Sequence, residues 1–397
     1  MSEQVAGTDA VEGQRTIAFG VIGCGLMGRE FASAAARWCH LLDQDVQPRI
    51  VAVCDANPAA MTWFARSIPG VRTYTDYHEL LADGEVEAVY CAVPHHLHRD
   101  VYIDILRAGK HLLGEKPFGI DKEAFEAVQA EIERRPELLV RCSSEYPFFP
   151  GALRLYDWMR EGRFGRIIEV EAGYWHCSDL NPNKPINWKR RIATCGEYGC
   201  MGDLGMHALH VPVRLGWQPR NVRALLTKIV NERPGPDGQM VPCETWDNAL
   251  LACEVITSGS QGTFPMTVTM KRIAPGHQSS MFLRVLGTAC SAEFTTRYPK
   301  QVRYMPYTAG GEQAWREVDV PFHSAYPTIT GEIFEFGFTD AICRCGRRFV
   351  TSWRTGVRAC ASRSTASRPR RRDAATICIR RRCARNEPAR RFDWTSE

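Results

Sequence analysis

TIAFGVIGCGLMG, residues 16–28, is the stretch of sequence that decides the fold of the amino-terminal half. An apolar run ends in three glycines spaced Gly-x-Gly-x-x-Gly, and a helical pattern follows. Such glycines let the backbone turn tightly and approach a pyrophosphate, which the amino end of a helix attracts. The pattern predicts a dinucleotide-binding loop made by Gly23, Gly25, Leu26, Met27 and Gly28.

An acidic residue follows the next strand-like run. Arg49–Cys54 is apolar and ends in Asp55, 27 residues after Gly28. A carboxylate there would accept hydrogen bonds from the adenosine ribose hydroxyls and repel a 2′-phosphate, so NAD is favoured over NADP as the cofactor. The alternative is a surface aspartate with no such role.

Strands and helices alternate through residues 16–145. Further strands are predicted at Val86–Ala92 and His111–Gly114, and helices at Ala59–Ser67, His98–Ala108 and Lys122–Arg135. This alternation is typical of a doubly wound parallel sheet, so we expect a Rossmann domain over residues 16–145.

The pattern changes at Tyr146, where prolines and aromatic residues interrupt it and the helix Gly151–Glu161 follows. A succession of strands then indicates an α+β domain over residues 146–342 with a large, mostly antiparallel open sheet. The expected strands are Ile167–Trp175, Val222–Val230, Ala249–Ile256, Gly262–Met270, Met281–Leu286 and Ser291–Thr295.

The formal net charge of +5 is unevenly distributed. From residue 342 onward, 16 arginines and four acidic residues give +12, which leaves about −7 on the first 341 residues. An acidic body argues against nucleic acid as the main partner. No apolar run reaches 18 residues, residues 1–15 are polar and we expect them to be disordered, and the 16 cysteines are expected to be reduced thiols. These features predict a cytoplasmic protein with no membrane segment.

Two segments in the Rossmann half resemble the Gfo/Idh/MocA family of oxidoreductases. Residues 92–98 read AVPHHLH and residues 108–117 read AGKHLLGEKP, where the family has Pro-Asn-x-x-His and then A-G-K-H-V-x-x-E-K-P, so that His95 replaces an asparagine. The resemblance covers residues 16–341 and implies that Lys116 lies beside the nicotinamide and contacts the reacting hydroxyl. The residues that it adds to the expected cofactor site are Pro94, His95, His98 and Glu115.

A second family segment lies at residues 199–210, which read GCMGDLGMHALH. Asp203 and His207 are four residues apart, so on a helix they share one face. The resemblance implies that His207 removes the hydroxyl proton as hydride leaves, and that Asp203 orients or charges it; a histidine titrates near neutral pH, which suits a base. The family pattern is broken at Glu197, Tyr198 and His210.

Aromatic residues and a polar loop complete the expected site. Tyr146, Trp175 and Trp188 are candidate substrate-binding residues, together with Lys116, Asp203 and His207, because aromatic faces and polar groups suit a sugar or polyol ring. The alternative interpretation of the loop Asn181–Arg191 around Trp188 is a plain surface loop. No metal is expected, since the spacing of Cys195, Cys200, His207 and His210 fits no familiar zinc pattern.

The resemblance implies an NAD-dependent dehydrogenase that oxidises a secondary hydroxyl of a sugar, sugar derivative or cyclitol, with hydride passing to nicotinamide C4. It also implies a homodimer or homotetramer. Two alternatives stay open: an NAD-dependent glycosidase that oxidises its sugar transiently and eliminates the aglycone, and a non-catalytic dinucleotide-binding regulator. Because Lys116, Asp203 and His207 are all present, the regulator is disfavoured.

The resemblance stops abruptly at the carboxyl end. Residues 343–397 are rich in Arg, Ala, Ser, Thr and Cys and contain neither lysine nor leucine. That bias is typical of an out-of-frame reading of GC-rich coding DNA, so we interpret the tail as a frameshift product. A basic arm for an acidic partner is the alternative, favoured by residues 368–372, RPRRR. With few large apolar residues, the tail is predicted to be disordered in either case.

Overall fold

The computed structural model describes residues 15–42, 46–257, 262–321 and 328–329. The expectations for the amino-terminal residues before Arg15 and for the tail at 343–397 lie outside the described residues. Within the described residues, no helix is both long enough and apolar enough to cross a membrane.

Six parallel strands form the sheet of the amino-terminal half, in the order β3-β2-β1-β4-β5-β6. The strands are β1 (Arg15–Ile22), β2 (Val46–Cys54), β3 (Arg72–Tyr74), β4 (Ala88–Cys91), β5 (His111–Glu115) and β6 (Val140–Ser143). The helices between them are α1 (Leu26–Ala36), α2 (Pro58–Ser67), α3 (Tyr77–Ala82), α4 (His98–Arg107) and α5 (Lys122–Arg134). The predicted Rossmann sheet is confirmed, and the sequence pattern missed β3, α3 and β6, which are too short to show a clear periodicity.

The strand order places the candidate residues at one edge of this sheet. β1 pairs with β2 on one side and with β4 on the other, so the chain changes direction across the sheet between these strands. The carboxyl ends of parallel strands lie together, and a ligand binds where the strand order reverses. Gly23 follows β1, Asp55 follows β2, Ala92 follows β4 and Lys116 follows β5.

Eight strands form the second sheet, in the order β16-β15-β14-β13-β7-β12-β11-β8. They are β7 (Ile167–Trp175), β8 (Pro219–Thr227), β11 (Asn248–Ile256), β12 (Thr263–Lys271), β13 (Ser280–Gly287), β14 (Cys290–Thr295), β15 (Gln301–Pro306) and β16 (Arg316–Asp319). All neighbouring pairs are antiparallel except β7 with β12. The expected mostly antiparallel sheet is therefore confirmed.

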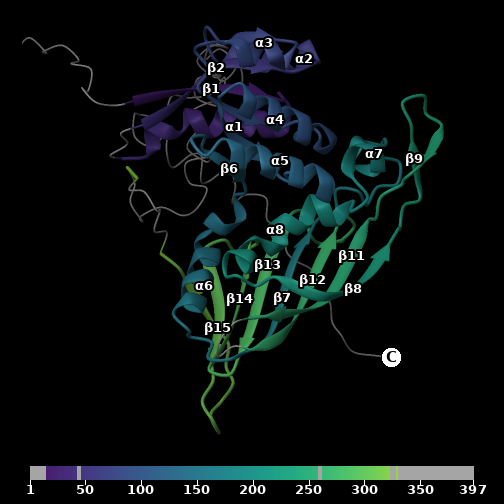
Figure 1. Cartoon of the computed structure of the whole chain (residues 1–397). Coiled ribbons are helices and arrows are strands. Elements are labelled where there is room, and N and C mark those ends of the chain that lie inside the picture. Colours follow the sequence, from purple (N-terminus) through teal and green to yellow (C-terminus); the bar gives the residue numbers. More distant parts are fainter. Residues whose placement is uncertain (1–14, 43–45, 258–261, 322–327, 330–397) are drawn as a thin grey trace, which may run out of the picture. The chain divides into compact units, whose positions relative to one another are not determined.

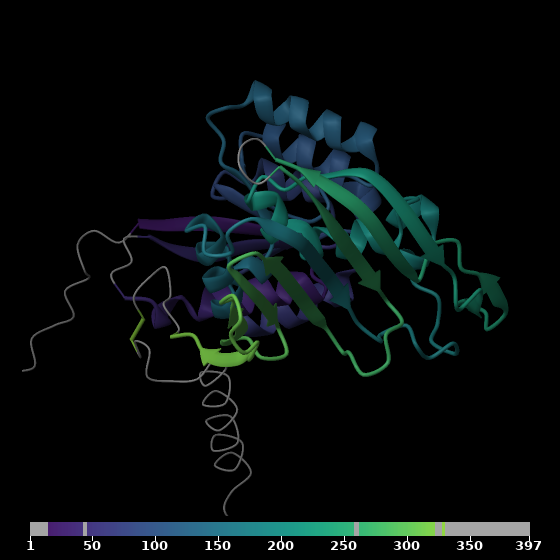
Figure 2. The same ribbon diagram turned by 90° about the horizontal axis from the view of Figure 1, so that it is seen from below.

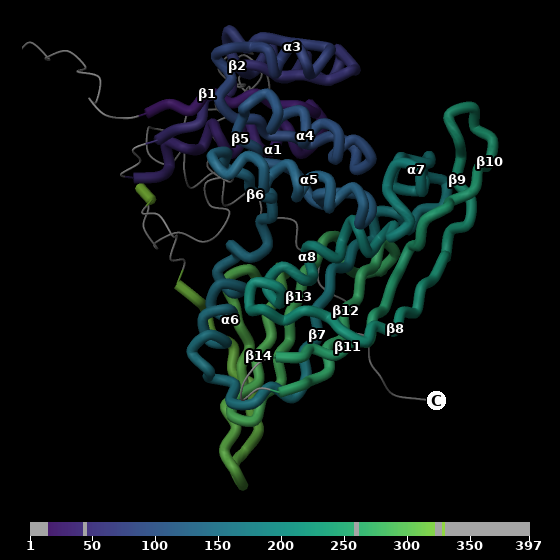
Figure 3. Tube along the Cα trace, in the orientation of Figure 1, coloured from purple at the N-terminus to yellow at the C-terminus, as the bar shows by residue number. Residues whose placement is uncertain are grey.

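Some elements of the second half differ from the sequence expectation. The strand predicted at Val222–Val230 is observed at Pro219–Thr227, because the backbone N–H groups of Ile229 and Val230 leave the sheet and donate to Asp247 Oδ2. β15, β16 and the hairpin of β9 (Glu232–Pro234) and β10 (Met240–Pro242), seen in Figure 3, were not predicted.

Helices pack on one face of the eight-stranded sheet (Figures 1 and 2). α6 (Pro150–Arg160) lies against β14 and β15, and α8 (Cys200–Arg214) lies against β7, β12 and β13. Their apolar side chains join those of the strands in one buried cluster, which includes Leu155, Leu204 and Val268. Burial of this interface fixes α8, and with it Asp203 and His207, against the sheet.

Candidate active site

The glycine loop after β1 is shaped by close backbone approaches. Gly23 has φ +97°, and a Cβ there would lie 2.5 Å from the carbonyl oxygen of Ala92. A Cβ on Gly28 would collide with the carbonyl oxygen of Gly23, whereas a Cβ on Gly25 would meet no atom within 4 Å. The first and third glycines therefore allow the turn itself, and the second leaves open space beside the loop.

The amino end of α1, beside this open position, suits the pyrophosphate of a dinucleotide. α1 begins immediately after Gly25, has no side-chain cap and carries no acidic residue in its first turn. Its free N–H groups and positive end can therefore meet a pyrophosphate. Asp55 is fixed beside the loop, because its carboxylate accepts hydrogen bonds from the backbone N–H groups of Cys24 and Asn57, both at 2.9 Å. Its remaining lone pairs can accept hydroxyl groups of a ribose.

A cavity of about 290 Å³ lies at the carboxyl edge of the parallel sheet and is lined from both halves of the chain. The Rossmann half supplies Met27, Ala92, Val93, His95, His98, Glu115, Lys116 and Glu145. The second half supplies Tyr146, Tyr174, His176, Trp188, Lys189, Asp203, Leu204 and His207. The fold thus joins two sequence segments, around Lys116 and around His207, that were expected to act together.

Asp203 is the centre of the charged cluster in this cavity. Lys116 Nζ donates to the backbone oxygen of Asp203 at 2.6 Å and to its Oδ1 at 3.0 Å. Lys189 Nζ lies 3.2 Å from Oδ1 and 3.0 Å from Oδ2, and Arg272 donates to Oδ2 at 2.8 Å. Burial by itself raises the pKa of the Asp203 carboxyl, but the three cations hold it well below its usual value. The carboxylate is therefore ionised.

His207 lies in an aromatic environment. Its ring centroid is 4.6 Å from that of Tyr146 and 4.9 Å from that of Tyr174, and its Nδ1 is buried with no hydrogen-bond partner among the described residues. Burial, followed by the charge of Lys116, lowers the pKa of His207 to about 2. The imidazole is therefore neutral, and it does not titrate near neutral pH as its residue type alone suggested.

The relation between Asp203 and His207 differs from the simplest expectation. Both side chains lie on α8, as predicted, but the carboxylate oxygens of Asp203 are bound to cations. The negative charge of Asp203 raises the pKa of His207, against the stronger effect of burial. Asp203 therefore acts on His207 through its electrostatic field.

Two histidines of the Pro94–His98 segment, His95 and His98, have different surroundings. The imidazole of His98 is fully buried, and its nitrogens lie 2.5 Å from the Pro117 oxygen and 2.8 Å from the Val93 oxygen. His98 thus ties together the two backbone segments that border the cavity. His95 lines the cavity, packs edge-on against Trp188 and lies 3.8 Å from Asp203 Oδ1.

The remaining predicted cofactor residues lie around the same strand ends. Glu115 is buried at the end of β5 and accepts a hydrogen bond of 2.7 Å from the Tyr90 hydroxyl. Pro94 precedes the short 3₁₀ helix His95–Leu97. Leu26 is 74% exposed at the start of α1, so its backbone, and not a buried side chain, is the group that could meet a ligand there.

Trp175 does not join the other candidate residues, which corrects its expected place in the substrate site. Successive residues of a strand point to opposite faces of the sheet, and Tyr174 and His176 point into the cavity beside α8. Trp175 therefore points to the open face, where its indole N–H donates to Thr269 Oγ1 at 2.8 Å. The alternation along β7 was a signal that could have identified His176 from sequence.

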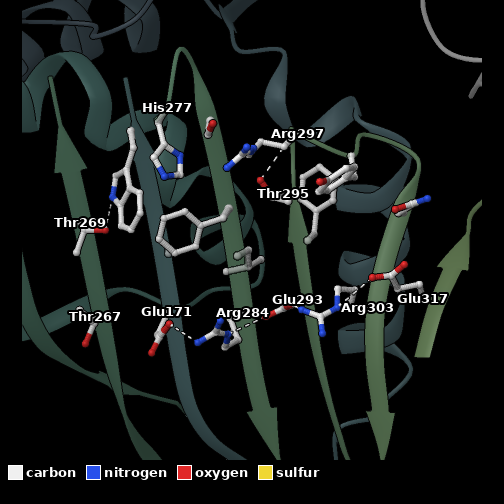
Figure 4. A pocket seen from close by; sticks show the side chains of 18 residues that line it. Glu171, Thr267, Thr269, His277, Arg284, Glu293, Thr295, Arg297, Arg303 and Glu317 are labelled. Atoms are coloured by element: carbon white, nitrogen blue, oxygen red, sulfur yellow. Dashed lines mark hydrogen bonds and ion pairs between the residues drawn. The ribbon is translucent and has the colours of Figure 1, made fainter. Parts of the chain in front are cut away.

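The open face carries a larger hollow, of about 960 Å³ (Figure 4). Arg284 pairs there with Glu171 and Glu293, and Arg303 pairs with Glu293 and Glu317. These pairs lie across neighbouring strands and are partly exposed. The groups that could transfer a proton or stabilise an alkoxide beside a dinucleotide line the smaller cavity, so we assign the candidate site there.

Sequence reasoning missed Lys189, Arg272, Tyr174 and Glu145 as neighbours of the site. Arg272 follows β12 and Lys189 lies in the 3₁₀ helix Trp188–Arg190, far apart in sequence from Lys116. Nothing in the local pattern of Lys189 or Arg272 marks them, because only the tertiary fold brings them to Asp203. Among the described residues, no group of three or more His, Cys, Asp or Glu side chains is arranged to hold a metal ion.

Comparison with known proteins agrees with this architecture. Residues 17–141 match the model of the oxidoreductase family with an NAD-binding Rossmann fold, and residues 152–293 match the Gfo/Idh/MocA carboxyl-terminal domain. Levoglucosan dehydrogenase of Pseudarthrobacter phenanthrenivorans is 25% identical over 69% of this chain and 72% of its own length. Inositol 2-dehydrogenase 2 of Saccharopolyspora erythraea is 33% identical over 40% of this chain and 44% of its own.

A solved structure has the same fold. Levoglucosan dehydrogenase in complex with NADH and L-sorbose superposes with a TM-score of 0.72 at 23% identity, covering 83% of this chain and 87% of the other. The two family models together match residues of the Rossmann sheet and of most strands of the second sheet, over more than half of the chain. The chain therefore belongs to the Gfo/Idh/MocA family of oxidoreductases and carries an NAD-binding Rossmann domain.

Proposed function

We propose that this protein is an NAD-dependent dehydrogenase that oxidises a secondary hydroxyl of a sugar, sugar derivative or cyclitol. The observation that carries the proposal is the meeting of Lys116 and a neutral His207 in one cavity, next to a loop that fits a dinucleotide. A positive group and a base are the two aids that removal of hydride from an alcohol requires, because the hydroxyl must lose its proton as the C–H bond breaks.

In this proposal His207 Nε2 accepts the hydroxyl proton, since its Nδ1 is buried away from hydrogen-bond partners in the described structure. The Lys116 ammonium has three N–H donors and uses two of them on Asp203, so one remains for the developing alkoxide. Asp203 holds that ammonium in place. NAD, when bound, supplies the acceptor for the hydride.

The relatives support the substrate class. Levoglucosan is an anhydrosugar and inositol is a cyclitol, and both names belong to dehydrogenases that are similar to this chain. The lining of the cavity also suits a polyol, because Tyr146, Tyr174 and Trp188 offer ring faces and Lys116 and Lys189 offer donors.

A screen of the purified protein with NAD⁺ against levoglucosan, L-sorbose, myo-inositol and glucose, followed by NADH absorbance, tests the proposal. Net NADH is expected with at least one polyol in the wild type. Replacement of Lys122, which is 73% exposed on α5, by Ala provides a lysine-loss control that keeps this activity. Release of an aglycone from a glycoside without net NADH would instead identify a glycosidase.

A further inference from the structure

A second ammonium group shares the site with Lys116. Lys189 and Lys116 both contact Oδ1 of Asp203, at 3.2 and 3.0 Å, so the two positive groups lie side by side on one carboxylate oxygen. Both side chains line the cavity, and that of Lys189 is 36% exposed. The cavity therefore presents a pair of neighbouring cationic donors.

Each ammonium keeps a donor for the cavity. A lysine has three N–H donors. Lys189 uses at most two of them on the oxygens of Asp203, as Lys116 uses two on the same residue, and no further acceptor for either is present in the described part of the chain. Burial, strengthened by Arg272 and Lys116, lowers the pKa of Lys189, which is the effect expected of a desolvated ammonium short of acceptors.

The backbone of Lys189 is fixed by hydrogen bonds, and the contacts of Nζ with Asp203 place its ammonium. Its N–H donates to Asn187 Oδ1 at 2.9 Å, and its carbonyl accepts a hydrogen bond of 2.9 Å from the hydroxyl of Thr245, which is fully buried. Its Nζ also lies 5.4 Å from the centre of the Trp188 ring. This anchoring means that a ligand need not order the lysine on binding.

We propose that Lys189 binds the substrate oxygen on the carbon next to the one that is oxidised, so that the enzyme selects vicinal diols over isolated secondary alcohols. Lys116 holds the reacting oxygen and Lys189 its neighbour, and Asp203 sets the spacing of the two ammonium groups. This inference rests on the proposed function, since it assigns the reacting oxygen to Lys116.

The test compares substrates within one protein sample. Levoglucosan and myo-inositol are each assayed against their monodeoxy analogues, in which a hydroxyl next to the reacting carbon is replaced by hydrogen. Loss of a hydrogen bond to a charged donor is expected to lower kcat/KM of the wild type about 10- to 100-fold for the analogue. In Lys189→Met the kcat/KM values of a polyol and of its monodeoxy analogue should differ by no more than about threefold. The loss for the parent polyol should appear mainly in KM.

The ratio of two kcat/KM values does not depend on how much of a sample is correctly folded. Lys189→Arg keeps a cationic donor and should restore part of the preference. Lys184→Met, which removes another partly exposed lysine of the same loop, is the matched control and should keep the wild-type ratio. An unchanged ratio in Lys189→Met, or an equal loss in Lys184→Met, would overturn the assignment.

Failure of the proposed function is distinguishable from failure of this inference. If the wild type oxidises none of the screened polyols, the dehydrogenase proposal fails, and the NADH-loaded protein is titrated calorimetrically with the same pairs. A preference for the diol that disappears in Lys189→Met then supports Lys189 as the site of the neighbouring oxygen. Equal affinities in wild type and variant, or no binding of any of these polyols, contradict it.

Discussion

The two walls of the cavity are built in different ways. On the Rossmann wall, the loop Gly23–Gly28 and the ends of the parallel strands place backbone groups and a few side chains by local geometry. On the opposite wall, Asp203 from α8 gathers Lys189 from a short 3₁₀ helix and Arg272 from the end of β12. The shape of the first wall depends on glycines, which have no Cβ. The arrangement of the second wall depends on a balance of buried charges.

That difference predicts how each wall responds to substitution. The glycine loop tolerates no side chain at Gly23 and Gly28, where a Cβ would collide with a backbone carbonyl. Removal of one charge from the buried cluster disturbs the balance of charges in a region of low dielectric, which costs more than the loss of an exposed pair.

The largest effects are expected where the walls meet. Lys116→Ala and His207→Ala should each lower kcat by about 10² to 10⁴, because one removes the positive group beside the alkoxide and the other the base. NAD affinity should change little, since neither residue belongs to the glycine loop. Steady-state kinetics and calorimetric titration with NAD⁺ measure the two quantities, and near-normal turnover in either variant would refute its role.

The buried charges of the second wall can be compared with the partly exposed ion pairs on the open face of the eight-stranded sheet. Arg272→Met should lower the free energy of unfolding by about 3 kcal/mol, because Arg272 and Asp203 are each 2% exposed. Arg284→Met, which breaks pairs with Glu171 and Glu293 on a side chain 45% exposed, should cost less than about 1 kcal/mol. Urea unfolding of both variants decides the matter, and similar losses would mean that burial does not separate the two clusters.

The glycines of the first wall separate folding from cofactor binding. Gly25→Ala should leave the melting temperature near that of the wild type, since its Cβ meets no protein atom within 4 Å, yet weaken NAD binding about tenfold or more by obstructing the pyrophosphate. Gly28→Ala should lower both, because its Cβ collides with the Gly23 oxygen. Retained NAD affinity in Gly25→Ala would argue against this placement of the cofactor.

Asp55, which lies beside the glycine loop, is expected to set the preference for NAD over NADP. NAD should bind about tenfold or more tightly than NADP, because the Asp55 carboxylate repels a 2′-phosphate, and Asp55→Ser should narrow the difference. Calorimetric titration with each nucleotide measures both affinities. Equal affinities in the wild type would remove Asp55 from this role.

The smallest expected effect concerns acid stability. Burial lowers the pKa of His95 to about 2, as it does for His207, while an unfolded histidine titrates near 6.5. Below pH 6.5 the unfolded chain binds more protons than the folded one, so the free energy of unfolding falls as the pH falls. At pH 5.5 His95 contributes about 1.4 kcal/mol of this loss.

His95→Asn should therefore lose fewer degrees of melting temperature between pH 7.5 and pH 5.5 than the wild type. The comparison is between the two decreases, since the variant also loses the contact of His95 with Trp188. Equal decreases would show that His95 is as easily protonated in the folded protein as in the unfolded chain.

The sequence alone determined the Rossmann half and the family, because those conclusions rest on local rules. A glycine spacing, an acidic residue after a strand and alternating apolar runs each act over a few residues, so they can be recognised without a fold. The pairing of Asp203 with His207 on one helix face was likewise visible in a spacing of four. The short strands β3 and β6, which lack a continuous apolar run, carry too little pattern to be predicted.

Only the tertiary structure decided the charge balance of the site. The approach of Lys189 and Arg272 to Asp203 joins residues 14 and 69 positions away along the chain, and no local pattern encodes a contact of that kind. The same is true of protonation: the imidazole of His207 is neutral because packing against Tyr146 and Tyr174 removes it from water. Desolvation and long-range Coulomb interactions depend on what surrounds a group in three dimensions, and the sequence supplies the groups without their surroundings.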